Sequence, residues 1–413
     1  MSKKEDKNEL RLNSLLKSYL DENVKGYSIS KDIGELELEV RFTRGKKITQ
    51  IQYENTIKRL LNKGFELKDP IHLLRIGLEY LDEKTGSYKQ SSVRVELEGL
   101  TNISEYCRSD NLNTDENMSS IKFTQKNNYK SATQGYIDPI DYNNFGFRVA
   151  FQTENNLVLT HPLVRNIVSQ WNNSKKTFRY ITRHRMIHPD LPVNIDLSIV
   201  KESKRRGHRY IPEYTFRASG VLDSYEVYEI EIEIDNRRVG IGTEYDTHEK
   251  LNVLLKKVIK FILSGLQDTN YPVSYDEQNM VAHEYNKLLW GEKEKDKSTD
   301  RIKLHNKNFV GPSSLTLQLQ NISEPDEDNM IPNIRTNYTV TDKADGDRKM
   351  LYIANGGKIY LIDTNMNIQF TGVISKRNEY YNTLIDGEHI LHNKHNDYIN
   401  LFACFDIYYI NGK

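Results

Sequence analysis

Short segments in which polar and apolar residues alternate fill most of residues 33–233. The clearest are ELELEVRF, SSVRVELEGL, IKFTQK, FGFRVAFQTE, FRYITRHRMI, VNIDLSIVK and YEIEIEID, separated by Asn, Gly, Asp and Ser. Alternation at this spacing predicts β-strands that form an antiparallel sheet or barrel. Before them, NELRLNSLLKSYL has leucines at helical spacing, which predicts a short amphipathic helix.

Two helices and a second β-rich region are predicted after the last of these strands. THEKLNVLLKKVIKFILSGL has an apolar helical face and a threonine suited to cap its start, and SYDEQNMVAHEYNKLLW also has a helical pattern. GEKEKDKSTD, at residues 291–300, has almost no apolar content and predicts a solvated linker. NYTVTDKADGDRKMLYIA, GKIYLIDT, TLIDGEHIL and NLFACFDIYYI then predict strands. We therefore expect domains at residues 1–290 and 301–413.

The composition restricts the class of protein. The 413 residues include 58 Lys+Arg and 58 Asp+Glu, so the chain as a whole does not attract nucleic acid, and phosphate binding requires locally sorted charge. The sequence has no apolar segment long enough to span a membrane and no export signal, which predicts a cytoplasmic protein without a membrane partner. Its 2 distant cysteines argue against a disulfide framework and a cysteine metal site.

Glutamates occupy one face of two predicted strands. Because residues two positions apart share a face of a strand, about 6.6 Å from each other, each of these faces carries three glutamates: Glu35, Glu37, Glu39, Glu229, Glu231 and Glu233. One such strand is typical of a sheet with its polar face in water. Two favour a cation site, since carboxylates about 4 Å apart repel by roughly 1 kcal/mol in water and about 4 kcal/mol when partly shielded. Oxygen ligands suit Mg²⁺ or Mn²⁺.

Basic side chains recur at alternating positions of the strands between the two acidic ones. They are Arg94, Lys122, Arg148, Arg179, Arg183 and Arg185. Cationic groups directed into a barrel require anionic partners, which phosphate oxygens provide. The pattern thus predicts a closed barrel that binds a metal ion with its glutamates and a polyphosphate with its basic residues. Asp196 and Ser198 share a face of NIDLSIVK, which fits either a position inside the barrel or an exposed strand end.

This arrangement resembles the triphosphate tunnel metalloenzymes, particularly the metal-dependent RNA 5′-triphosphatases of fungal and large-DNA-virus type. Their first strand carries an E-x-E pair followed by a basic residue, matched here by Glu37, Glu39 and Arg41, and EIEIE matches their late acidic strand. The resemblance covers about residues 33–235. It implies an α+β fold with an antiparallel eight-stranded β tunnel and flanking helices.

The same resemblance implies metal-dependent removal of the γ-phosphate from 5′-triphosphate RNA. The glutamates of the two acidic strands would be the catalytic metal ligands, and Arg41 would join the other basic residues in binding the triphosphate. Glu35 and Glu229 extend each acidic run by one residue, so two choices of ligand pair stay open in each strand.

A second resemblance begins at TDKADGDR. Its D-G pair is typical of a hairpin turn, but the pattern K-x-D-G-x-R also resembles the first motif of covalent nucleotidyltransferases, namely mRNA guanylyltransferases and polynucleotide ligases. LIDGEHI and ACFDIYYI resemble two later motifs of these enzymes. The resemblance implies that Lys343 attacks GTP and carries GMP, and that GTP is bound by Asp345, Gly346, Arg348, Glu388, Phe405 and Asp406.

Together the two parts resemble the mRNA capping enzymes of nucleocytoplasmic large DNA viruses, because a triphosphatase and a guanylyltransferase catalyse consecutive capping steps. This implies a location in the host cytoplasm or the virion. The family's E-G and K-x-K motifs, its OB-fold and its methyltransferase are missing from the sequence. We therefore expect an incomplete β-rich nucleotidyltransferase domain, with the remainder in a longer chain or a second polypeptide, and doubtful guanylyl transfer by these residues alone.

Three other functions are compatible with the sequence. The barrel could be a phosphohydrolase of free nucleoside triphosphates or polyphosphate. It could bind RNA without catalysis, with its glutamates in water. The second domain could instead be part of a ligase-type nucleotidyltransferase.

Overall fold

The chain forms two compact units, Met1–Asp268 and Thr269–Lys413, in a computed structural model. The structure describes residues 3–26, 34–42, 47–82, 86–112, 121–131, 135–207, 209–291, 305–311, 316–325, 331–340 and 343–413. Most of the predicted linker at 291–300 lies outside these residues. No helix in the described ranges is long and apolar enough to cross a membrane.

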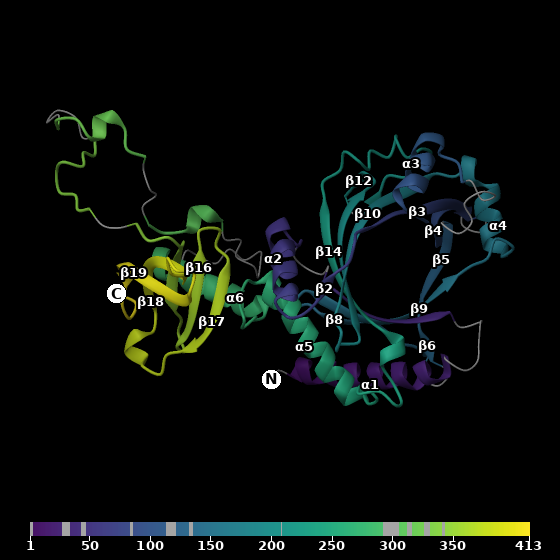
Figure 1. The fold of residues 1–413 in the computed structure, drawn as a ribbon, viewed down its shortest axis with the longest axis horizontal. Helices are drawn as coiled ribbons and strands as arrows, with labels where there is room; N and C mark the ends of the chain where they lie inside the picture. The colour runs from purple at the N-terminus through teal and green to yellow at the C-terminus, as the bar shows by residue number, and fades with distance from the viewer. Residues whose placement is uncertain are drawn as a thin grey trace. The chain divides into compact units, whose positions relative to one another are not determined.

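Strands of the first unit close into an antiparallel barrel, which Figure 1 shows nearly end-on. Each strand pairs with the next, and the ring closes because β9 also pairs with β1. In order around the barrel the eight strands are β1 (Glu35–Arg41), β14 (Val227–Ile234), β11 (Val193–Glu202), β10 (Lys176–Ile187), β3 (Ile71–Asp82), β4 (Ser87–Glu98), β5 (Ile121–Asn128) and β9 (Phe147–Asn156). The predicted eight-stranded tunnel is therefore confirmed.

Short strands extend the barrel or stand beside it. β2 (Glu66–Leu67) pairs with β10, and β8 (Ile140–Tyr142) pairs with β9. Two small hairpins join β6 (Lys130–Ser131) to β7 (Gly135–Tyr136) and β12 (Arg205–Arg206) to β13 (Arg209–Tyr210).

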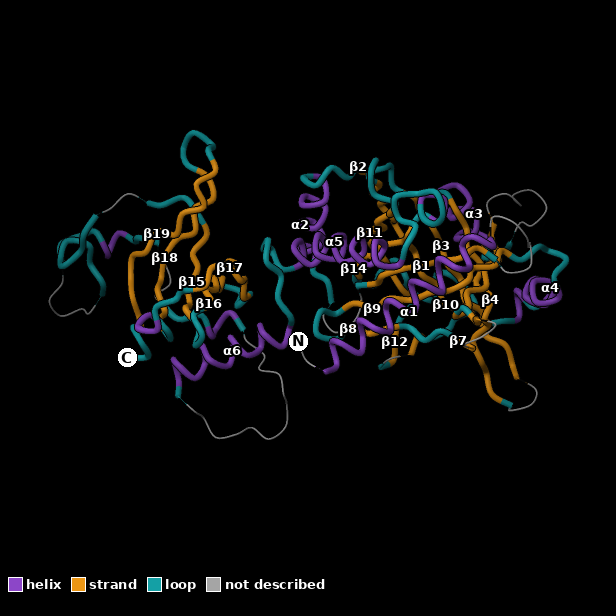
Figure 2. Tube along the Cα trace, turned by 90° about the horizontal axis from the view of Figure 1, so that it is seen from below, coloured by secondary structure: helices purple, strands orange, loops and turns teal. Residues whose placement is uncertain are grey.

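Helices cover the outside of the barrel on two sides (Figure 2). α1 (Lys3–Gly26), α2 (Gln50–Leu61) and α5 (His248–Leu266) pack their apolar faces on β1, β9, β11 and β14. α3 (Leu100–Ser109) and α4 (Pro162–Ser169) pack on β3, β4 and β5. The sequence predicted helices in the regions of α1 and α5. The Thr247 side chain caps α5, as predicted, by accepting a hydrogen bond from the Lys250 amide.

β3 is the one barrel strand that the alternation pattern did not indicate. Its residues Leu73 and Leu74 are adjacent and both apolar, which interrupts the alternation. Leu74 packs outward against the helix-covered core, whereas Leu73 belongs to a small apolar cluster with Ile181 and Val200. Leu73 is opposite Ile181, and Ile181 is opposite Val200, so the cluster is on the interior side of the barrel.

The second unit is a five-stranded antiparallel sheet with a helix on one face. Its strand order is β17 (Ile368–Ile374), β16 (Lys358–Asp363), β15 (Asp347–Ile353), β18 (Thr383–His392) and β19 (Tyr398–Tyr409). α6 (Tyr275–Trp290) buries Val281 and Tyr285 against Met350 and Tyr360 of this sheet. The β-rich character predicted for this region is confirmed.

The predicted domain boundary is too late in the chain. The sequence assigned α6 to the first domain and placed the division at residues 291–300, but the units divide after Asp268. The physical reason is that the apolar face of α6 is buried in the core of the second sheet. The segment of low apolar content at 291–300 follows α6 in the sequence. It does not mark the division between the two cores.

Candidate active site inside the barrel

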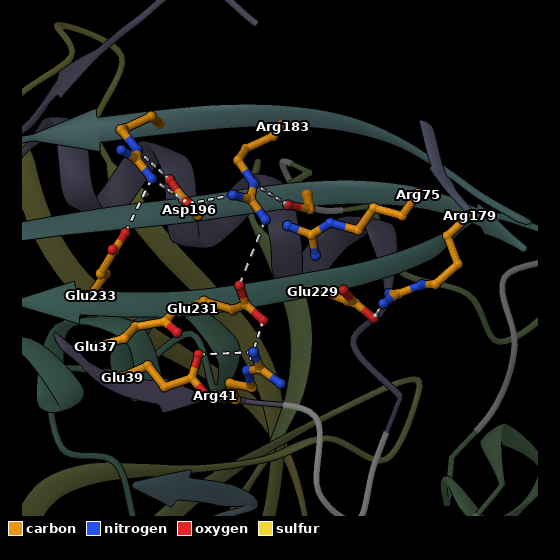
Figure 3. A network of polar contacts seen from close by, with 12 residues as sticks. Glu37, Glu39, Arg41, Arg75, Arg179, Arg183, Asp196, Glu229, Glu231 and Glu233 are labelled. Carbon is orange, nitrogen blue, oxygen red and sulfur yellow. Dashed lines mark hydrogen bonds and ion pairs between the residues drawn. The ribbon is translucent and has the colours of Figure 1, made fainter. Parts of the chain in front are cut away.

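The direction of the β1 side chains decides where the first acidic run lies. Leu38 and Val40 are both 0% exposed and pack in the core beneath the outer helices. Because side chains alternate along a strand, Glu37, Glu39 and Arg41 project to the other side, into the barrel. Figure 3 shows these three side chains pointing toward residues of the neighbouring strands.

Strand register brings the second acidic run to the same place. Glu39 is directly opposite Glu233 on β14, and Arg41 is opposite Glu231. On the next strand, Asp196 is opposite Glu231. Residues opposite each other in antiparallel strands point to the same face. Acidic side chains from β1, β14 and β11 therefore converge inside the barrel (Figure 3).

Every acidic residue of this centre contacts a cationic side chain. Lys126 Nζ lies 2.5 Å from Glu37 Oε2 and 2.8 Å from Glu39 Oε2. Arg41 binds Glu39 at 2.8 Å and Glu231 at 3.0 Å. The remaining pairs are Arg183 with Asp196 at 3.0 Å and with Glu231 at 3.8 Å, and Arg185 with Asp196 at 2.7 Å and with Glu233 at 3.2 Å.

The acidic groups differ in how strongly they hold their charge. Burial raises the pKa of Glu233 to about 7, and the charges of Asp196 and Glu37 add to the increase. Burial also raises the pKa of Glu39 despite its contacts with Arg41 and Lys126. For Glu231, burial is outweighed by the guanidinium groups of Arg41 and Arg183, which lower its pKa. The centre thus contains carboxylates whose charge is incompletely compensated.

The structure brings some of the predicted basic residues to this centre and pairs others elsewhere. Arg41, Arg183 and Arg185 contact the acidic centre directly. Arg94 is bound to Glu154 of β9, and Arg148 to Asp141 of β8. The other two are bound to glutamates outside the centre, Arg179 to Glu202 and Glu229, and the half-exposed Lys122 to Glu98.

These contacts also separate the members of each glutamate run. Glu229 is 2.7 Å from Arg179 rather than near the Glu39 and Glu233 pair, and Glu35 is exposed at the start of β1. Glu37, Glu39, Glu231 and Glu233 are the four that share the centre.

Three residues of the barrel interior were missed or left undecided by the sequence. Lys126 stands four positions after Lys122 on the same face of β5, so strand parity could have found it. Arg75, bound to Glu96 at 2.5 Å, lies on the unrecognised strand β3. Asp196, for which the sequence allowed two positions, is 3% exposed and lies in the interior.

The donor chemistry of the centre fits a hard divalent cation. Its four glutamates offer carboxylate oxygens, which Mg²⁺ and Mn²⁺ prefer, and the raised pKa values of Glu39 and Glu233 indicate charge that a cation would stabilise. In the described part of the chain, however, no three acidic, histidine or cysteine side chains converge closely enough to hold a metal ion. Lysine and arginine groups fill the spaces between the carboxylates instead.

The second predicted site lies on β15 and β18 of the second unit. Lys343 and Asp345 are exposed just before β15, and the Lys343 Nζ is 3.2 Å from the Ala344 carbonyl oxygen. The Gly346 amide donates to Glu388 Oε1 at 3.2 Å. A Cβ atom at Gly346 would lie 2.6 Å from the His389 carbonyl oxygen, so this position requires glycine. Gly346 and Glu388 are thereby in contact, and Lys343 precedes Gly346 by three positions.

Arg348 is held by a residue that the sequence did not single out. Its Nε and Nη2 atoms donate to the two carboxylate oxygens of Asp386 at 3.1 and 2.5 Å, and Asp386 is 1% exposed. The Arg348 guanidinium lies 6.0 Å from the ring centre of Phe405, which is itself 59% exposed. Asp406 is directly opposite Asp386 and exposed. Asp386 thus contacts Arg348 and is the strand partner of Asp406, and Phe405 lies beside Arg348.

Comparison with known proteins finds capping enzymes. Residues 273–413 match the family model described as mRNA capping enzyme, catalytic domain. A probable mRNA-capping enzyme of Acanthamoeba polyphaga mimivirus is 32% identical over 185 residues, which is 45% of this chain. The match spans only 13% of that relative's length. The relationship to capping enzymes that the sequence indicated is confirmed by these two matches.

Two solved structures are similar to this chain at lower sequence identity. The RNA triphosphatase domain of a trifunctional mimivirus mRNA capping enzyme is 18% identical with a TM-score of 0.36, covering 60% of this chain and 96% of that one. The S. pombe Pct1 RNA triphosphatase is 12% identical with a TM-score of 0.35, covering 62% of this chain and 92% of that one.

Proposed function

We propose that the first unit removes the γ-phosphate from 5′-triphosphate RNA with the help of Mg²⁺ or Mn²⁺, as the first step of mRNA capping. The observation that carries this proposal is the convergence of four glutamates with Arg41, Arg183 and Arg185 inside a closed barrel. In the reaction an oxygen of water bonds to the γ-phosphorus and the bond to the bridging oxygen breaks, so the RNA keeps a 5′-diphosphate end.

Glu37, Glu39, Glu231 and Glu233 would hold the cation, which when bound supplies positive charge that polarises the γ-phosphate. The guanidinium groups of Arg41, Arg183 and Arg185 bind the phosphate oxygens by exchanging their carboxylate partners for them. Their positions on β1 and β10 of one closed barrel would place positive charge where the negative charge of the transition state develops. The closed barrel would orient the phosphate chain with its terminal phosphate toward the glutamates.

An RNA substrate is favoured over a free nucleotide by the second unit. Its match to the capping-enzyme catalytic domain supports a role for the whole chain at an RNA 5′ end. The alternative is a barrel phosphohydrolase that acts on free nucleoside triphosphates. Phosphate release from 5′-triphosphate RNA and from ATP, each with Mg²⁺ and with Mn²⁺, separates the two. We expect release from RNA, whereas release from ATP alone would favour the alternative.

Paired substitutions within each glutamate run identify the metal-binding members. Glu37→Gln and Glu231→Gln should abolish release from RNA, because these side chains lie in the acidic centre. Glu35→Gln and Glu229→Gln are the matched controls on the same strand faces and should keep most of the activity. Equal loss in all four variants would contradict this assignment.

We further propose that the second unit contributes the nucleophile of a guanylyltransferase. The Lys343 amine, after losing its proton, would form a bond to the α-phosphorus of GTP while the bond to pyrophosphate breaks, which leaves GMP on the lysine. Asp345, Gly346, Arg348, Glu388, Phe405 and Asp406 would bind the nucleotide. Since the relative that matches is much longer, we expect transfer to need further polypeptide, in the same chain or a second one, which could also bring a methyltransferase.

The test of the second step uses the longest reading frame that contains this chain. Incubation with GTP labelled in the α-phosphate should label the protein, and Lys343→Ala should remove the label. Lys349→Ala is unsuitable as a control because Lys349 is buried, whereas the exposed Lys376 offers a matched substitution. Labelling by ATP and not by GTP would identify a ligase-type enzyme instead.

A further inference from the structure

Lys126 reaches two glutamates on a strand that its own strand does not contact. β5 pairs with β4 and β9, and β9 stands between β5 and β1 around the barrel. The residue directly opposite Lys126 is Glu154 on β9, which is bound to Arg94. The Lys126 ammonium nevertheless lies between Glu37 and Glu39 of β1, at 2.5 and 2.8 Å from their Oε2 atoms. Its side chain crosses the interior face of β9.

β9 provides a path for this side chain. The β9 residue opposite Glu39 is Ala150, whose methyl group is the only side-chain atom at that position. The β9 residue opposite Glu37 is Gln152, and its side-chain amide donates to Asn128 on β5 at 3.1 Å. The Ala150 side chain is small, and the Gln152 side chain is hydrogen-bonded to Asn128 of β5. Together they leave room for the Lys126 side chain to reach the glutamates.

The Lys126 ammonium lies between the carboxylates of Glu37 and Glu39, where a metal cation bound by both would also lie. Two glutamates on one face of β1 repel each other, and a positive charge between them offsets that repulsion. The lysine side chain is 13% exposed and the Glu39 side chain 4%, so this contact is largely removed from solvent. An ammonium is a compact charge on a flexible stem, unlike the planar guanidinium of Arg41, which is also bound to Glu231.

We propose that the Lys126 ammonium occupies the divalent-cation position between Glu37 and Glu39, and that a bound cation displaces it toward the triphosphate. This inference rests on the proposed function, because it takes Glu37 and Glu39 as the cation ligands. Five carboxylates of the centre, those of Glu37, Glu39, Asp196, Glu231 and Glu233, face four cationic groups, those of Arg41, Lys126, Arg183 and Arg185. A divalent cation bound by Glu37 and Glu39 would replace the Lys126 ammonium there. The ammonium would then be available to phosphate oxygens.

The consequence is a coupling between the two ligands of the site. Without the divalent cation, Lys126 is held by Glu37 and Glu39 and contributes little to phosphate binding. With the cation bound, the same ammonium faces the incoming triphosphate. The cation and the RNA end should therefore strengthen each other's binding by more than their direct contact provides, and by thermodynamic linkage the effect is reciprocal.

Mn²⁺ binding without RNA, followed by electron paramagnetic resonance, tests the exchange apart from catalysis. Lys126→Gln should bind Mn²⁺ more tightly, on the order of tenfold or more, because no internal cation competes in a partly shielded site. Lys126→Arg keeps the charge and should stay near the wild-type affinity. Lys122→Gln is the matched control on the same face of β5, where Lys122 is bound to Glu98, and should change nothing. Unchanged or weaker Mn²⁺ binding in Lys126→Gln, or Mn²⁺ binding in neither protein, would overturn the proposal.

Labelling of lysine amines in the wild-type protein gives a second test that needs no substitution. Acetylation with and without Mg²⁺ is measured by mass spectrometry, with Lys122 as the internal reference. Mg²⁺ should increase the labelling of Lys126 severalfold relative to Lys122, because the displaced ammonium is no longer held between two carboxylates. Equal or lower labelling would overturn the proposal. A protein that releases no phosphate from RNA would contradict the proposed function, but it leaves both of these comparisons able to decide on Lys126.

Discussion

Asp196 is the carboxylate that binds two arginines of the barrel centre, Arg183 and Arg185. Its carboxylate accepts from Arg185 at 2.7 and 2.8 Å and is 3.0 Å from Arg183, while its own side chain is 4% exposed. Removing one partner of a buried ion pair leaves the other charges uncompensated, which costs more than the pair itself contributes. The two arginines, Arg183 and Arg185, that we propose to bind phosphate therefore share this carboxylate as their partner at the shortest distances.

Asp196→Asn should lower the free energy of unfolding by about 3 kcal/mol, because the buried carboxylate shared by two partly buried guanidinium groups loses its charge. Glu66→Gln is a matched control, since Glu66 is exposed and its ion pair is with the exposed Lys68. Its effect should stay within about 1 kcal/mol. Chemical denaturation without added metal measures both, and equal effects of the two substitutions would show that Asp196 is not a structural centre of the site.

Glu233 should make the stability of the metal-free protein depend on pH. Burial raises its pKa from 4.5 to about 7, so between these values the folded state binds more protons than the unfolded state. Stability contributed by the protonated form is present at low pH and is lost as pH rises through about 7. The thermal midpoint of the wild type should therefore fall over this range by more than that of Glu233→Gln. Parallel curves for the two proteins would contradict the raised pKa.

At the scale of elements, alternation along the sequence predicted most of the barrel strands. In β1 and β14 glutamate alternates regularly with Leu, Ile or Val, and this predicted that their glutamates share one face of the sheet. β3 was missed because the adjacent apolar residues Leu73 and Leu74 interrupt its alternation. α2 was missed as well, although the structure shows a capping box between Thr49 and Gln52 at its start. The contact of Lys126 with β1 was missed because the register places Lys126 opposite Glu154 of β9, and only its long side chain reaches across β9 to Glu37.

The apolar cluster inside the barrel accounts for part of its stability. Ile181 is 1% exposed among Leu73 and Val200, so Ile181→Ala should lower the free energy of unfolding by about 2–4 kcal/mol through lost burial and a cavity. Ile71→Ala on β3 is the control, because Ile71 is 37% exposed and its truncation should cost about 1 kcal/mol or less. A small effect at Ile181 would mean that this cluster is open to water.

At the scale of the whole molecule, two cores belong to two units, and the division after Asp268 determines how the chain can be cut. The sequence could not indicate this, because α6 and α5 have similar helical patterns and only their packing partners differ. The low-apolar segment after α6 was the stronger compositional signal, yet it lies within the second unit.

Truncation tests this division. A fragment of residues 1–268 should unfold cooperatively and keep phosphate release, because it retains all barrel strands and their helices. A fragment of residues 1–290 adds α6 without its sheet and exposes Val281 and Tyr285, both 0% exposed in the chain. It should self-associate more strongly in sedimentation velocity. A better-behaved 1–290 fragment would restore the boundary at 291–300.

The central claim is that the glutamates converging inside the barrel support hydrolysis of an RNA 5′-triphosphate. The most direct measurement is release of label from γ-labelled triphosphate RNA by the wild-type chain and by Glu39→Gln, with Mg²⁺ or Mn²⁺ and with Glu66→Gln as the control. We expect metal-dependent release by the wild type and the control, and a loss of roughly 100-fold or more in Glu39→Gln, since a lost ligand to a catalytic ion costs several kcal/mol. Release that persists in Glu39→Gln, or none in the wild type, would contradict the claim.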